Sequence, residues 1–415
     1  MKKLLLIASF VLSGCGGGSP PDPTVESIAE PVTKAPAVIN CVVPSSIAPA
    51  HYTGSYSIPT PTQRLDTNIQ RAVGLKDYYA GSACSYGVTL DRLQALGVDR
   101  VWVYNYGRWN DFSKDIWTID KDEWQIPESS FTYLVTEAKK RNIKVFLALQ
   151  FTAVDKKGVF LPFGERVPEA TMRKILNSHH KLIVDYVKYG EKIGLAGVSL
   201  DWNAYYILNM HEYTELWATS MVAIAKDIRA NFSGVLTYGQ MGSPIYDSRI
   251  YDVIDEIHIS LIPRLTEFEN SNISVALLKT KFTELINSAY SQFYNTNKPV
   301  TWEIAVQSRD KYFTEGWVED GFCIGSLNGS PIAYDSTNCV QKSYIPDFSI
   351  QAMGIEAAFE AIAEQNKFIT KSIDFHSSYW HTDTLSNSNE GFPYLSQSIR
   401  GKPAEKIVKQ WFSRS

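Results

Sequence analysis

Apolar and polar positions along the chain follow two periods. Short runs rich in β-branched and aromatic residues recur, and segments with apolar residues at three- and four-residue spacing lie between them. The runs predict strands at residues 71–75, 98–104, 143–151, 195–201, 234–240, 253–262, 300–303 and 372–375. Alternating strands and helices favour βα units in a parallel sheet. Eight such strands close well, so the predicted fold class is α/β, a (β/α)8 TIM barrel.

The helical segments carry recognisable ends. Residues 87–96 predict a helix that stops at Gly97, and residues 212–230 predict another. The clearest helix has an apolar stripe that includes Met172 and Leu176, begins after Pro168 and stops at Gly194. These segments supply the crossovers that parallel strands require.

The N-terminus has the pattern of a targeting segment. Lys2 and Lys3 precede an apolar run at residues 4–12, which is too short to span a bilayer. The run ends in Leu-Ser-Gly-Cys15, which looks like a bacterial lipobox; an ordinary secretory signal with a chance cysteine is the alternative. We therefore expect a lipoprotein signal peptide at 1–14, a lipidated Cys15 and flexible tether at 15–50, and one barrel domain at 51–415. This organisation predicts a lipid-anchored protein of the bacterial cell envelope, at the outer membrane or cell surface.

Composition excludes some partners. The net charge is −4 and no basic block appears, which argues against nucleic acid. The seven histidines are scattered, and neither a phosphate-binding glycine loop nor a dinucleotide fingerprint occurs, so we expect no metal and no cofactor.

Four cysteines other than Cys15 suggest disulfides in an oxidising compartment. Cys41–Cys84 and Cys323–Cys339 are the favoured pairs, although three pairings are formally possible, and the sequence leaves the oligomeric state open.

Two carboxylates fall at predicted strand ends. Glu303 closes the seventh strand and Asp201 closes the fourth. The C-terminal strand ends of such a barrel form its active-site mouth. Cleavage of a glycosidic bond needs two carboxyl groups that flank the bond. Glu303 and Asp201 are therefore candidate catalytic residues, and a helix N-cap or loop anchor is the alternative role for Asp201.

Aromatic, amide and imidazole side chains also follow the predicted strands. A sugar ring stacks on Trp or Tyr, and its hydroxyls need polar partners. Any single aromatic residue could instead pack a loop against the barrel. The predicted substrate-binding residues are Tyr104, Tyr106, Trp109, Asn203, Tyr205, Tyr238, Gln240, His258, His376 and Trp380. The expected partner is thus a carbohydrate, and the insert between Glu303 and Pro346 is expected to shape its specificity.

Four stretches resemble clan-A glycoside hydrolases, nearest to the β-mannanase-like glycoside hydrolase family 113. They read Gly-Val-Leu-Thr-Tyr at 234–238, Ile-Asp-Glu-Ile at 254–257, Lys-Pro-Val-Thr-Trp-Glu-Ile at 298–304 and Arg-Gly-Lys-Pro-Ala-Glu at 400–405. The resemblance covers residues 70–412 and is specific at the seventh strand and the C-terminus. It implies a (β/α)8 barrel, a retaining mechanism and Glu303 as the nucleophile.

The fourth strand departs from that family. Clan A ends this strand in Asn-Glu, with Glu as acid/base, whereas this chain reads Leu200-Asp201-Trp202-Asn203. The stretch also resembles the Asp-x-Glu signature of family 18 barrels, with Asn203 in place of Glu, and α-glycosidases that use a nucleophilic Asp on this strand. The sixth strand lacks the Tyr that clan A aims at its nucleophile. Two hypotheses follow. The protein is a glycoside hydrolase with Asp201 as acid/base and Glu303 as nucleophile, or with these two roles exchanged. Alternatively, it is a non-catalytic glycan-binding lipoprotein that has lost its acid/base.

Overall fold

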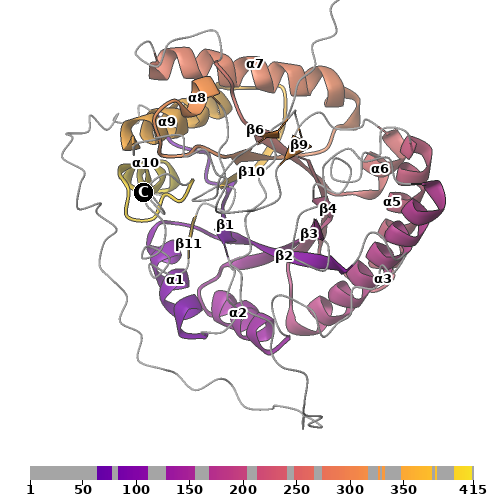
Figure 1. Cartoon of the computed structure of the whole chain (residues 1–415). Coiled ribbons are helices and arrows are strands. Elements are labelled where there is room, and N and C mark those ends of the chain that lie inside the picture. Colours follow the sequence, from indigo (N-terminus) through magenta and orange to yellow (C-terminus); the bar gives the residue numbers. More distant parts are fainter. Residues whose placement is uncertain are drawn as a thin grey trace, which may run out of the picture.

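The computed structural model describes residues 63–76, 83–110, 128–154, 168–202, 213–240, 247–265, 273–315, 326–327, 330–331, 347–375, 379–380 and 397–413. Eight parallel strands form one closed sheet (Figure 1). They are β1 (Gln70–Lys76), β2 (Arg100–Asn110), β3 (Lys144–Val154), β4 (Gly197–Trp202), β5 (Val235–Gln240), β6 (Glu256–Leu261), β7 (Val300–Ile304) and β10 (Thr370–Phe375). Each strand pairs with the next in this order, and β10 pairs with β1 to close the barrel. The predicted barrel is confirmed.

A ring of helices surrounds this sheet (Figure 1). The ring contains α1 (Ala83–Ala95), α2 (Glu128–Lys140), α3 (Glu169–Ile193), α5 (Thr214–Arg229), α6 (Ser248–Val253), α7 (Val275–Phe293), α9 (Phe348–Glu364) and α10 (Pro403–Phe412). Shorter elements are η4 (Tyr294–Thr296), α8 (Tyr312–Glu315), β8 (Ser326–Leu327), β9 (Ser330–Pro331) and β11 (Tyr379–Trp380), which extends the sheet beside β1. No helix in the described ranges is long and apolar enough to cross a membrane.

Local sequence explains where the long helices begin and end. Helix α3 follows Pro168 and ends at Gly194, whose φ of 84° lies in the left-handed region that glycine favours. The side chain of Ser274 accepts a hydrogen bond from the Leu277 amide at the start of α7. Asp347 accepts from the amides of Ser349 and Ile350 at the start of α9. These caps satisfy amides that the first helical turn leaves without partners.

The strands separate two apolar regions. Outward-facing residues such as Val101 and Leu147 pack with the helices in the main core. Inside the barrel, a smaller cluster contains Ala72, Trp102, Phe146 and Ala148. Successive side chains of a strand point to opposite faces of the sheet. A residue that is paired with a member of this cluster on the neighbouring strand therefore also faces the barrel interior.

Some expected boundaries differ from the observed ones. The sixth strand begins at Glu256 rather than residue 253, because Asp247 caps the short helix α6, which runs to Val253. The expected signal peptide, Cys15 and tether lie outside the described residues. Cys41, Cys323 and Cys339 lie outside them as well, and the side chain of Cys84 is not described, so the disulfides stay predictions.

Candidate active site

Three adjacent strands bring polar side chains together inside the barrel. Ser260 of β6 pairs in register with Glu303 of β7, and Glu303 pairs with Asp374 of β10. His258 lies two residues before Ser260 on the same face of β6. Glu303 and Asp374 each lie next to the last residue of their strands, so the group is near the C-terminal ends, where barrel enzymes place their chemistry.

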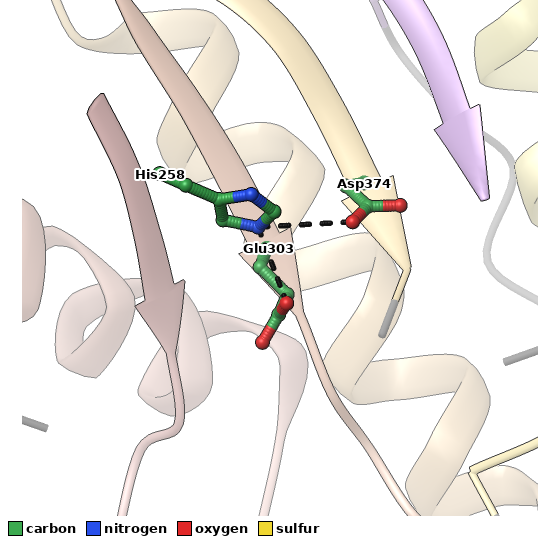
Figure 2. Close-up of side chains that lie close together, drawn as sticks. All are labelled: His258, Glu303 and Asp374. Atoms are coloured by element: carbon green, nitrogen blue, oxygen red, sulfur yellow. Dashed lines mark ion pairs between the residues drawn. The ribbon is translucent and has the colours of Figure 1, made fainter. Parts of the chain in front are cut away.

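Imidazole and carboxylate groups converge in this cluster (Figure 2). His258 Nε2 lies 3.2 Å from Glu303 Oε2 and 3.7 Å from Asp374 Oδ2. The Ser260 hydroxyl donates a hydrogen bond of 2.7 Å to Glu303 Oε1. The Trp102 ring packs beside the His258 ring at a centroid distance of 5.2 Å. These contacts hold the Glu303 carboxylate in one orientation.

The cluster is shielded from solvent. The side chains of His258, Glu303 and Asp374 have 0% exposure. Burial raises the pKa of the Asp374 carboxyl well above its ordinary value, and the neighbouring charge of Glu303 raises it further. The positive charge of Arg100 and the backbone amide of Phe375 oppose this rise. Asp374 is thus biased toward its neutral form.

A second polar layer lies toward the N-terminal ends of the strands. The Arg100 guanidinium forms a buried ion pair of 2.9 Å with Glu256 and donates a hydrogen bond of 3.2 Å to Gln70. The Phe146 ring lies 3.5 Å from the guanidinium carbon, measured to the ring centroid. The hydroxyl of Thr301 donates to Glu256 over 3.2 Å. Arg100 therefore has its own partner and does not pair with Glu303.

The backbone places Asp201 at a distinctive position. Strand β4 is separated from β7 by β5 and β6, so Asp201 and Glu303 lie on well-separated strands of the barrel. Ala148 and Gln150 of β3 pair with Ser199 and Trp202, which leaves one extra residue on the β4 side. Such bulges often occur beside active sites, where they re-aim a side chain. The side chain of Asp201 is not among those described.

The structure bears differently on each of the remaining predicted site residues. His258 lies beside Glu303, whereas Tyr238 is fully buried between β5 and the helices. Its hydroxyl accepts a hydrogen bond of 2.9 Å from Trp217 of α5, and its ring packs on Tyr251, so we leave Tyr238 out of the site. The predictions for Tyr104, Tyr106, Trp109, Gln240 and Trp380 concern side chains that are not described, and Asn203, Tyr205 and His376 lie outside the described residues.

Asp374 was not among the sequence candidates. Most predicted candidates lie at or after the end of a strand and stand out as polar residues beside apolar runs, whereas Asp374 lies within the short strand at residues 372–375. A usable signal was present, because Ser372 and Asp374 alternate with Ile373 and Phe375. A strand covered by helices on one face and polar on the other indicates a polar barrel interior.

The cluster also has metal-binding residue types. In the described part of the chain, His258, Glu303 and Asp374 are the one group whose donor atoms lie within 4.8 Å of one another. Three protein donors correspond to a metal with an open position for water, while closed structural sites use four. All three side chains are shielded from solvent, so we assign no metal to them.

No family model and no curated protein matches this chain. Among solved structures, it resembles a family 113 β-1,4-mannanase in a complex, with a TM-score of 0.56, 15% identity, and coverage of 83% of this chain and 98% of that one.

A family 113 β-mannanase from Alicyclobacillus acidocaldarius gives a TM-score of 0.56 at 14% identity, over 83% of this chain and 96% of that one. A third family 113 mannanase gives 0.55 at 14% identity, over 85% and 100%. The similarity in fold to this clan-A family is confirmed, and at these identities it extends to the fold alone.

Proposed function

We propose that this protein is a glycoside hydrolase that acts on an oligo- or polysaccharide by a retaining mechanism. The observation that carries the proposal is the Glu303 carboxylate, which Ser260 and His258 orient inside the C-terminal part of a mannanase-like barrel. Glu303 acts as the nucleophile. Asp201, across the barrel on the bulged end of β4, acts as the acid/base.

The two carboxyl groups act in sequence. A carboxylate oxygen of Glu303 attacks the anomeric carbon, while the Asp201 carboxyl transfers its proton to the departing glycosidic oxygen. This step forms a glycosyl ester on Glu303 and leaves Asp201 ionised. Asp201 then removes a proton from water, the water oxygen attacks the same carbon, and the ester bond to Glu303 breaks. No cofactor takes part.

The substrate is recognised by the residues that follow the strands. Tyr104, Tyr106, Trp109, Tyr205 and Trp380 are the proposed sugar platforms, and Asn203, Gln240, His258 and His376 are the proposed hydroxyl partners. Cys15 carries the lipid anchor that holds the enzyme at the cell envelope. Because the similar solved structures are named β-1,4-mannanases, β-1,4-mannan is the first substrate to test.

The test is hydrolysis of a glycan panel by soluble protein that starts near residue 35. Wild type is compared with Glu303→Gln and Asp201→Asn, and with the matched surface variant Glu215→Gln. We expect both site variants to lose activity, by at least about 10²-fold, and the surface variant to retain it. Full activity of Glu303→Gln would contradict the proposal, and loss in Glu303→Gln alone would remove Asp201 from the mechanism.

Two observations favour a glycan-binding protein as the second candidate. Asn203 stands where the related signatures have a catalytic Glu, and Asn is a poor proton donor. Hydrolysis also requires the sugar to reach Glu303, whose side chain has 0% exposure. Calorimetric binding of a panel sugar that wild type never cleaves would establish this alternative.

A further inference from the structure

Asp374 and Glu303 form a pair of buried carboxyl groups on neighbouring strands. Their Cα positions are partners in the register of β7 and β10, so the two side chains lie at the same level of the barrel. Both have 0% exposure, and together with His258 each offers a donor atom within 4.8 Å of the others. Two negative charges this close in a buried site repel each other strongly, so ionisation of one carboxyl opposes ionisation of the other.

The surroundings do not supply enough positive charge for two carboxylates. Asp374 is faced by Glu303 of β7, by His258 of β6 and, at longer range, by Arg100 of β2. Arg100 is already paired with Glu256 over 2.9 Å. Since this guanidinium also has to balance Glu256, the cluster of Glu303, Asp374 and His258 needs a proton of its own.

The contacts of Glu303 and Asp374 indicate which of the two carboxyl groups is more easily protonated. Glu303 Oε1 accepts a hydrogen bond from Ser260, which favours the anion, and Glu303 Oε2 lies 3.2 Å from His258 Nε2. Among the described residues, no side chain donates a hydrogen bond to either oxygen of Asp374. The neutral form is therefore less costly on Asp374 than on Glu303.

We propose that Asp374 is a positioning residue that holds the proton of this pair at neutral pH and thereby leaves Glu303 as the ionised member. The consequence for catalysis rests on the proposed function, because an ionised Glu303 is what the nucleophilic step requires. Activity then falls at low pH when Glu303 gains a proton. It falls at high pH when Asp201 loses the proton that it has to donate, and also when Asp374 loses its proton and a second negative charge appears beside the nucleophile.

Asp374→Asn tests this role because an amide is a neutral isostere of the protonated acid. The variant should keep kcat at the wild-type optimum, and the pH at which its activity falls on the alkaline side should rise to the value that the proton loss of Asp201 alone sets. Glu356→Gln removes a buried carboxyl of α9 outside the barrel interior. This control variant should leave the pH dependence of activity unchanged on both the acidic and the alkaline side. A loss of about 10²–10⁴-fold in Asp374→Asn would show that Asp374 itself transfers protons and would overturn the positioning role.

Infrared spectroscopy tests the proton without requiring any activity. The difference spectrum of wild type minus Asp374→Asn at pH 7 should contain the C=O band of a protonated, buried carboxyl. In Glu303→Gln the titration midpoint of that band should fall, because the neighbouring charge is gone. Absence of the band would overturn the proposal even for an active enzyme, and its presence without turnover on any glycan would support it while the proposed function fails.

Metal titration tests whether a proton or a metal ion neutralises the Glu303–Asp374 pair. We expect Zn²⁺ and Mn²⁺ to leave the thermal midpoint of wild type and of Asp374→Asn equally unaffected. Stabilisation of wild type alone by either ion would show that the pair is neutralised by a metal and would overturn the proposal.

Discussion

The buried ion pair between Arg100 and Glu256 makes a quantitative prediction about stability. Replacing Arg100 with Met removes the charge but retains an unbranched apolar side chain beside Phe146. Among the described residues, Glu256 then keeps only the hydroxyl of Thr301 as a partner, at 3.2 Å. Removing one member of a buried ion pair typically costs about 3–5 kcal/mol, since the other charge stays buried and uncompensated.

The assay is urea unfolding followed by circular dichroism. With a slope of about 3 kcal/mol per molar urea, Arg100→Met should lower the midpoint by roughly 1 to 1.7 M. The double variant Arg100→Met/Glu256→Leu removes both charges and should recover most of this loss, because burying two apolar groups in place of an ion pair is often neutral or stabilising.

A matched control is the surface cation Arg249, which bridges Glu215 and Asp247 through contacts of 2.6–2.8 Å. Its side chain is 46% exposed, so Arg249→Met should leave the urea midpoint nearly unchanged. The reasoning is refuted if Arg100→Met behaves like Arg249→Met, or if the double variant loses as much as the two single variants combined.

Three further predictions concern the scaffold. Gly197→Ala would place a Cβ 2.2 Å from the Phe146 ring. The substitution should therefore lower the free energy of unfolding, measured with denaturant, by about 1–3 kcal/mol, and Phe146→Leu should restore part of it. Burial lowers the pKa of His179 to about 4. The unfolded chain therefore binds more protons, and stability should fall by about 3 kcal/mol as the pH drops from 6.5 to 4, a slope that His179→Gln removes. Burial raises the pKa of Glu356, which accepts a hydrogen bond of 2.8 Å from Trp411 Nε1. Trp411→Phe should therefore cost about 1–3 kcal/mol, and a thermal midpoint equal to wild type would contradict it.

Much of the barrel was predictable because strands buried on both faces are apolar and short. All eight strands were placed from such runs, and α3 was placed from its stripe, Pro168 and Gly194. Helix α9 was missed for a physical reason. It is buried on almost every side, so residues such as Ile350, Ala357 and Ile362 leave no polar face from which a helical period can be recognised.

The site was predictable only in part. Glu303 was recognisable because it lies at the end of an apolar strand, and His258, which was predicted to bind substrate, lies 3.2 Å from it. The pairing with Asp374 depends on the register between β7 and β10, two strands separated by more than 60 residues of sequence. Register across such a distance is set by barrel closure rather than by local pattern, so the sequence alone did not reveal the pair.

The two polar layers inside the barrel have a consequence for how such a chain evolves. Arg100 and Glu256 hold the N-terminal half of the strands together, whereas Glu303 and Asp374 lie in the C-terminal half. A lineage can therefore exchange or discard catalytic groups at one end while selection for folding acts on the other. Asn203 directly follows β4, whose last residue is Trp202, so exchange of this residue would leave the ion pair of Arg100 and Glu256 intact.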